Sequence, residues 1–169
     1  MAPAQESSTS LTKEISSVPL LDVGRGNKKI RQEILKKISE VYDAGCFVYG
    51  PDCRELESRI AEISSAKYAI GCASGSEALL VALMAHDIGP GDEVILPSFT
   101  FFATASAVWR LGAKVVFADI DPSTFNMDAK HVESLVNSNT RAIIPVHLFG
   151  QCADMDLLGK LADQHGLLV

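Results

Sequence analysis

The sequence predicts an α/β protein with a mainly parallel sheet flanked by helices. From residue 68 onward, short apolar segments rich in β-branched residues alternate with longer segments of helical periodicity. Turn signals such as Gly89-Pro-Gly-Asp92 separate them. Parallel strands need a long connection between them, usually a helix, so this alternation favours βαβ units. The 169 residues are also enough to enclose a hydrophobic core.

The first part of the chain carries a different pattern. Residues 1–17 are polar and rich in Ser and Thr, which predicts a disordered leader. Residues 28–42 carry an apolar stripe at helical spacing and predict an amphipathic helix. Gly45 and Gly50-Pro51 then interrupt the chain, and a second amphipathic helix is predicted over residues 54–64.

The alternation of strands and helices begins with a short strand over residues 68–71. A helix follows over residues 77–86, and its composition is apolar almost all round, which predicts burial on more than one side. The next strands are predicted over residues 93–96, 114–118 and 142–146, and the helices between and after them over residues 102–111, 128–137 and 154–165. Asp128 is a suitable N-cap for its helix. Residues 166–169 have the composition of one further strand.

Composition and charge argue against several classes of partner. The formal net charge is −6, whereas a nucleic-acid-binding protein favours a basic face. No apolar segment approaches the length that spans a membrane, and the N-terminus does not resemble a signal peptide. The four cysteines form no C-x-x-C pair, so no metal site is expected. We therefore expect a cytoplasmic protein with reduced cysteines, no nucleic-acid partner and no membrane partner.

The segment Ser74-Gly75-Ser76-Glu77 has the composition of a phosphate-binding turn at a helix start. Gly75 lets backbone N–H groups approach an anion closely, and Ser76 adds a hydroxyl donor. The helix that follows directs its unpaired N–H groups and the positive end of its dipole toward the same place. By spacing alone, a simple N-cap turn without a ligand is the commoner meaning of such a segment.

An aromatic residue, Phe99, follows the predicted strand over residues 93–96. Loops at the carboxyl ends of parallel strands commonly carry ligand contacts. A core position is nevertheless the more common use of phenylalanine. His147 stands similarly after the strand over residues 142–146, and a structural role is the commoner expectation for such a histidine.

In this order and spacing, Cys72–Leu79 and the segment that begins at Pro97 resemble the DegT-like sugar aminotransferases, pyridoxal 5'-phosphate (PLP) enzymes of fold type I. Other segments that match the family pattern are Phe47–Pro51, Phe117–Pro122, Phe125–Asp128 and Pro145–Gln151. The resemblance covers nearly the whole chain from Val18 onward. It implies that residues 18–169 are the N-terminal part of the PLP-binding large domain, with its remainder and a small C-terminal domain absent.

The resemblance also assigns roles to individual residues. Gly75, Ser76 and the backbone N–H of Glu77 correspond to the ligands of the cofactor phosphate. The Glu77 carboxylate is expected to turn away from the phosphate and to interact with the helix dipole. Phe99 corresponds to the aromatic residue that stacks on the PLP ring. Phe101 and Phe102 are assigned to packing, and His147 to the pocket wall or to a structural contact.

Two groups that PLP chemistry requires are not identified in the sequence. They are the lysine that forms a Schiff base with the cofactor and the carboxylate that contacts the pyridine nitrogen. The resemblance places both beyond Val169, and none of Lys114, Lys130 and Lys160 lies in a matching motif. Residues 1–169 alone are therefore expected to be inactive.

For the intact protein, the resemblance implies a homodimeric aminotransferase. It would move an amino group from an amino acid, glutamate by expectation, to a nucleotide-linked keto-sugar. Three alternatives remain open. They are a sugar dehydratase of the same family with histidine in place of the lysine, another fold-type I enzyme such as a desulfurase or an amino-acid lyase, and a non-catalytic regulatory relative.

Overall fold

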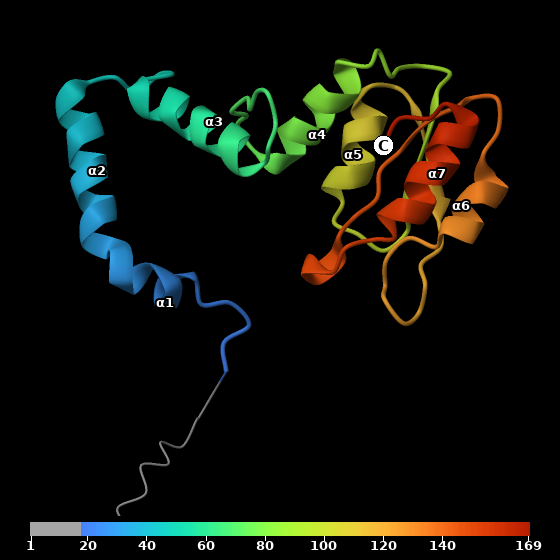
Figure 1. The fold of residues 1–169 in the computed structure, drawn as a ribbon, viewed down its shortest axis with the longest axis horizontal. Coiled ribbons are helices and arrows are strands. Elements are labelled where there is room, and N and C mark those ends of the chain that lie inside the picture. The colour runs from blue at the N-terminus through green and yellow to red at the C-terminus, as the bar shows by residue number, and fades with distance from the viewer. Residues whose placement is uncertain (1–17) are drawn as a thin grey trace, which may run out of the picture. The chain divides into compact units, whose positions relative to one another are not determined.

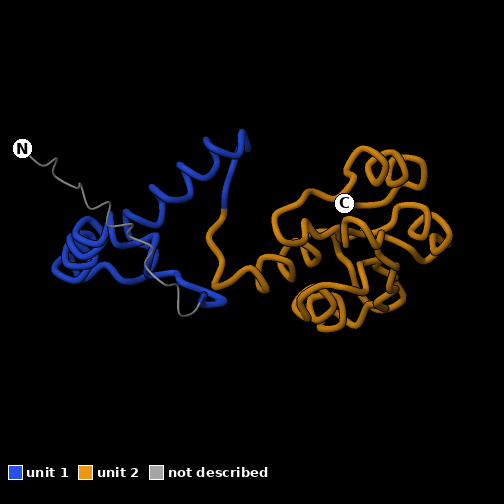
Figure 2. Tube along the Cα trace, turned by 90° about the horizontal axis from the view of Figure 1, so that it is seen from below, with its two compact units in different colours: residues 1–69 blue, residues 70–169 orange. Residues whose placement is uncertain are grey.

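A computed structural model describes residues 18–169 (Figure 1). The chain divides into two compact units, residues 1–69 and residues 70–169 (Figure 2). The leader predicted over residues 1–17 lies outside the described residues. Within residues 18–169, no helix is both long enough and apolar enough to cross a membrane. Cys46, Cys53, Cys72 and Cys152 are free and exposed.

The described part of the first unit, residues 18–69, contains helices and no strand. Their bounds are α1 Val23–Asn27, the 3-10 helix η1 Lys28–Ile30, α2 Arg31–Ala44 and α3 Pro51–Ile63. Helix α2 ends at Gly45, whose φ of 64° is the left-handed conformation that glycine adopts without a steric penalty. Helix α3 begins at Pro51, three residues before the predicted start, because the fixed φ of proline suits the first helical position.

The second unit contains a three-stranded parallel sheet, which confirms the predicted fold class. Its strands are β1 Glu93–Pro97, β2 Lys114–Ala118 and β3 Thr140–Ile143, in the order β2-β1-β3. The helices are α4 Gly75–Met84, α5 Ala103–Arg110, α6 Ala129–Leu135 and α7 Met155–His165, with a 3-10 helix η2 at Leu148–Gly150. Asp128 caps α6 as expected, since its carboxylate accepts a hydrogen bond from the Lys130 backbone N–H.

The central strand β1 separates two hydrophobic clusters. Val94 and Leu96 belong to the cluster under α4 and α5, whereas Ile95 belongs to the cluster under α6 and α7. Successive side chains of a strand point to opposite faces, so a strand covered by helices on both sides is apolar throughout. Figure 1 shows this arrangement, with α5 on one side of the sheet and α6 and α7 on the other.

Two predicted strands differ in the structure. Residues 68–71 form no strand, and Ile70 is 80% exposed. Residues 166–169 contribute a single parallel bridge between Leu168 and Ala142. An apolar segment becomes a strand only when a neighbour offers a matching row of hydrogen-bonding groups. Sequence composition predicts the tendency of a segment to form a strand. Whether the strand forms depends on a neighbouring strand with which it can pair.

The burial of α4 also differs from the expectation. Only Leu80 and Leu83 of this helix are buried, whereas Val81 and Met84 are 48% and 54% exposed. The prediction of burial on more than one side is therefore wrong for the described chain. Apolar composition shows how much of a helix surface can be buried. The elements that pack against the helix determine how much of it is actually buried.

Candidate functional site

The predicted phosphate-binding turn forms the first turn of α4. Ser74 is the N-cap, with an extended backbone (φ −164°, ψ 167°), and its Oγ accepts a hydrogen bond from the Glu77 backbone N–H at 3.2 Å. The helix therefore begins at Gly75, two residues before the predicted start. Gly75 and Ser76 occupy its first two positions, where backbone N–H groups have no partner within the helix.

The space beside Gly75 is suitable for an anion. A Cβ added to Gly75 would have no atom within 4 Å, so no neighbour in the described chain requires glycine there. The open space, the Ser76 hydroxyl and the positive end of the α4 dipole all occur in the same helical turn. The Glu77 N–H is different, because it already donates to Ser74. The turn thus offers Gly75 and Ser76 as donors, with Glu77 as a third only if its bond to Ser74 is shared or broken.

The Glu77 side chain has a partner that the sequence did not predict. Its Oε1 accepts a hydrogen bond from Arg110 Nη1 at 2.7 Å, and the two side chains are 39% and 42% exposed. This ion pair joins α4 to α5, and at this exposure it contributes less than about 1 kcal/mol. Its electrostatic effect is local. Arg110 offsets a negative charge in the turn that is expected to receive a phosphate.

Phe99 lies in the loop directly after β1 and is not a core residue. Its side chain is 48% exposed, and its ring contacts that of Phe125, with 6.0 Å between centroids and 45° between planes. The preceding residue, Ser98, donates its backbone N–H to Ala118 O at 2.8 Å, which fixes the start of this loop against the end of β2. Phe99 is thus free to present one face while its backbone is restrained.

The packing role expected for Phe101 and Phe102 is not seen. Their side chains are 76% and 73% exposed. Phe102, Trp109 and Phe117 instead line an apolar hollow on the outer side of α5 and β2. Packing is the usual role of phenylalanine, but β2 is an edge strand among the described residues, and its outer side is uncovered.

His147 serves a structural contact in the loop after β3. Its Nδ1 accepts the backbone N–H of Ala153 at 3.1 Å, which leaves Nε2 as the nitrogen that carries the proton in a neutral ring. The side chain is otherwise exposed. Of the two alternatives for His147, the structure therefore shows the structural contact.

Asn126 is a buried polar residue whose importance the sequence did not reveal. It is 4% exposed, and its amide nitrogen donates to the carbonyl oxygens of Gln151 and Cys152, both at 3.1 Å. Its Oδ1 accepts the Leu148 N–H at 3.1 Å. This one side chain fixes the loop after β3 to the loop after β2. The only signal in the sequence was an amide between two apolar residues, which is typical of many turns.

Asp121 organises the loop after β2. Its carboxylate accepts hydrogen bonds from the backbone N–H groups of Ser123 and Thr124, at 2.7 and 3.0 Å, and from the Ser123 hydroxyl. These bonds, the Ser123 hydroxyl first, hold the pKa of Asp121 below its usual value. The loop therefore contains a charged, multiply bonded carboxylate close in sequence to Phe125.

The chain is similar to known proteins of one family. The sequence model of the DegT/DnrJ/EryC1/StrS aminotransferase family matches residues 28–169. A curated relative, "Pleiotropic regulatory protein" of Geobacillus stearothermophilus, is 49% identical over 90% of this chain and 41% of its own length. UDP-2-acetamido-2-deoxy-3-oxo-D-glucuronate aminotransferase of Pseudomonas aeruginosa is 44% identical over 90% of this chain and 42% of its own length.

Solved structures agree with the sequence matches. The crystal structure of NtdA from Bacillus subtilis, with bound cofactor PMP, has a TM-score of 0.88 and 34% identity, over 93% of this chain and 37% of its own. The chain spans about two fifths of the length of the curated relatives described above. Its α/β architecture is that of fold-type I aminotransferases. The match over residues 28–169 shows that the chain belongs to the DegT/DnrJ/EryC1/StrS aminotransferase family.

Proposed function

We propose that the intact protein is a PLP-dependent aminotransferase that transfers an amino group from an amino acid, glutamate, to a nucleotide-linked keto-sugar. Family membership supports the reaction class, and the P. aeruginosa relative is named for a reaction of this kind. The observation that carries the proposal is the first turn of α4, where two N–H donors and a hydroxyl occur beside open space.

In this proposal each residue of the turn has a separate task. The backbone N–H groups of Gly75 and Ser76, and the Ser76 hydroxyl, bind the phosphate group of PLP. The α4 dipole adds a favourable field, and Arg110 limits the repulsion from the Glu77 carboxylate. Phe99 lies against the flat ring and excludes water from that face. When bound, PLP supplies an electron-withdrawing ring that stabilises negative charge on the substrate carbon.

We place the lysine that binds PLP covalently, and the carboxylate for its pyridine nitrogen, outside residues 1–169. Neither has a matching motif in this sequence. Lys114 is already engaged, because its Nζ donates to Glu93 Oε1 at 2.7 Å. Lys130 and Lys160 lie on the exposed surface. It follows that residues 1–169 alone are proposed to be inactive.

A cytoplasmic homodimer is part of the same proposal. The exposed apolar residues Val81 and Met84 on α4 provide surface that association could cover. Light scattering on the intact protein tests this directly. A protein that stays monomeric at every concentration measured would contradict the dimer.

A non-catalytic regulatory role is the second candidate. The observation that favours it is the name of the G. stearothermophilus relative, which is 49% identical to this chain. Two measurements on one preparation of the intact protein distinguish the aminotransferase from the non-catalytic regulator. An absorbance band of bound PLP, together with glutamate-dependent amination of a UDP- or dTDP-linked keto-sugar, supports the enzyme. A protein that binds no PLP and transfers no amino group would support the regulator instead.

A further inference from the structure

Phe125 has an unusual backbone for an aromatic residue. It lies in the loop between β2 and α6, and its φ is +60°. The left-handed region is crowded for residues with a bulky side chain, so Asn, Asp or Gly is the more usual choice there. A strained conformation persists only where surrounding contacts hold it, and such positions occur more often than average at functional sites.

Two sets of hydrogen bonds hold Phe125 in this conformation. Its N–H donates to Asp121 O at 2.8 Å, and the Asp121 N–H donates to Asn126 O at 2.9 Å, so Asp121 bridges both sides of the residue. The buried Asn126 amide then bonds the backbone of the loop after β3 at 3.1 Å. These hydrogen bonds hold the loop conformation, and the Phe125 side chain takes no part in them.

The Phe125 side chain lies beside that of Phe99. It is 47% exposed, which is too much for a core residue, and its ring contacts that of Phe99 at 6.0 Å between centroids. An aromatic pair at this distance and tilt is favourable beyond the area that it buries. The backbone strain at Phe125 is thus associated with a ring that supports Phe99 and does not fill the core.

We propose that Phe125 is a positioning residue, whose ring holds that of Phe99 in the orientation in which Phe99 contacts the flat face of PLP. The inference rests on the proposed function, because it assigns Phe125 a role through Phe99. Phe125 itself need not touch the cofactor. Asn126 and Asp121 are the residues that keep the Phe125 backbone in place.

The test separates the ring of Phe125 from its backbone. In the full-length protein, Phe125→Asn removes the ring but suits a positive φ, and Phe125→Tyr keeps the ring. We expect Phe125→Asn to weaken PLP affinity about two- to tenfold and to alter the absorbance or circular dichroism of bound PLP. The melting temperature of the PLP-free protein should fall only by the small amount that the loss of one half-exposed aromatic pair causes, and Phe125→Tyr should restore both cofactor signals.

A double-mutant cycle with Phe99→Ala identifies the route of the effect. If Phe125 acts through Phe99, the Phe125→Asn change has no further effect on PLP affinity in the Phe99→Ala background. The same cycle on the unfolding of the PLP-free protein should show coupling between the two rings. Equal effects of Phe125→Asn in both backgrounds, or an unchanged PLP affinity in the single variant, would overturn the inference.

Phe149 provides the matched control. It is also an aromatic residue with positive φ (53°), it is 89% exposed, and its ring has no aromatic partner among residues 18–169. Phe149→Asn should leave PLP affinity unchanged. If Phe125→Asn lowers folding stability, Phe125→Gly repeats the test with a residue that adopts this φ freely. A wild-type protein that binds no PLP would instead contradict the proposed function itself, and ring coupling in the PLP-free cycle would still be measurable.

Discussion

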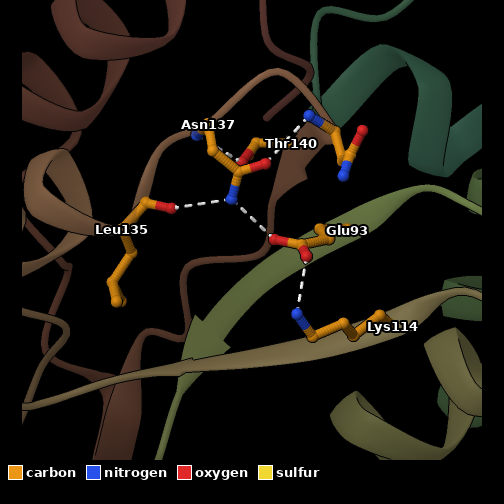
Figure 3. Close-up of polar contacts among 6 residues, drawn as sticks. Glu93, Lys114, Leu135, Asn137 and Thr140 are labelled. Carbon is orange, nitrogen blue, oxygen red and sulfur yellow. Dashed lines mark hydrogen bonds and ion pairs between the residues drawn. The ribbon is translucent and has the colours of Figure 1, made fainter.

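Glu93 and Lys114 are direct partners in the parallel ladder between β1 and β2, and their side chains form an ion pair of 2.7 Å (Figure 3). The second oxygen of Glu93 accepts a hydrogen bond from Asn137 Nδ2 at 2.8 Å. The carboxylate is nearly buried, with its side chain 10% exposed, whereas Lys114 is 70% exposed. One buried charge therefore joins the starts of β1 and β2 to the turn that leads into β3.

The Glu93 carboxylate should make stability depend on acid pH. The hydrogen bonds from Lys114 and Asn137 hold the pKa of Glu93 below its usual value of 4.5, against the opposing effect of burial. Because this pKa is lowered in the folded state, the ionised Glu93 carboxylate stabilises the fold in full above the pKa of the unfolded state. This stabilisation is lost as the pH falls through the folded-state pKa. The free energy of unfolding should therefore decrease below about pH 4.5.

The variant Glu93→Gln tests this dependence by urea denaturation at pH 7 and at acid pH. At pH 7 the free energy of unfolding of this variant should be about 1–2 kcal/mol lower than that of the wild type. The loss is limited because Lys114 is largely exposed and solvent screens the ion pair. Its stability should then vary less with pH than that of the wild type below pH 4.5. Glu133→Gln on α6 is the control and should change stability by less than about 0.5 kcal/mol. An identical pH profile for wild type and Glu93→Gln would refute the assignment.

Ser74 and Ser76 lie two residues apart and should give opposite phenotypes. Ser76→Ala removes a proposed phosphate donor, so PLP affinity should fall roughly tenfold or more while stability stays near that of the wild type. Ser74→Ala removes the N-cap bond to Glu77 and should lower stability by about 0.5–2 kcal/mol. Fluorescence titration with PLP and thermal melts distinguish the two. An unchanged PLP affinity in Ser76→Ala would remove Ser76 from the site.

Phe99→Ala should affect the cofactor more than the fold. Because Phe99 is 48% exposed, its loss should destabilise the PLP-free protein by less than the roughly 3–5 kcal/mol typical of a buried phenylalanine. PLP affinity should fall and the cofactor absorbance should change. Melting temperatures with and without PLP are the measurement. A large loss of stability with normal PLP binding would mean that Phe99 is structural after all.

Lys114 should not be modified by PLP in a specific way. Its Nζ is bonded to the Glu93 carboxylate, so it is poorly placed to react with an aldehyde. After incubation of residues 1–169 with PLP and reduction with borohydride, mass spectrometry should show no single pyridoxyl adduct. The intact protein should show one, on a lysine outside this range. A specific adduct on Lys114, with amino transfer by residues 1–169, would show that the catalytic lysine had been misplaced.

Local patterns in the sequence determined the elements that depend on neighbouring residues. The strand over residues 114–118 has the bounds that were predicted, and Asp128 caps α6 as its position before the helix suggested. Both results follow from short-range chemistry, namely the preference of a short apolar, β-branched segment for a strand and the bond of a carboxylate to the first turn of a helix. The order of short motifs was likewise sufficient to indicate the family.

Contacts between distant residues were decided by the tertiary structure alone. Arg110 pairs with Glu77 across 33 residues, and the Asn126 amide bonds Gln151 across 25. The exposure of Phe101 and Phe102 and the absence of a strand at residues 68–71 likewise depend on which element lies alongside. A sequence specifies which groups need a partner, because backbone and polar groups cannot be buried unpaired. Which partner they find is set by the packing of helices on the sheet, and that packing has no local signature.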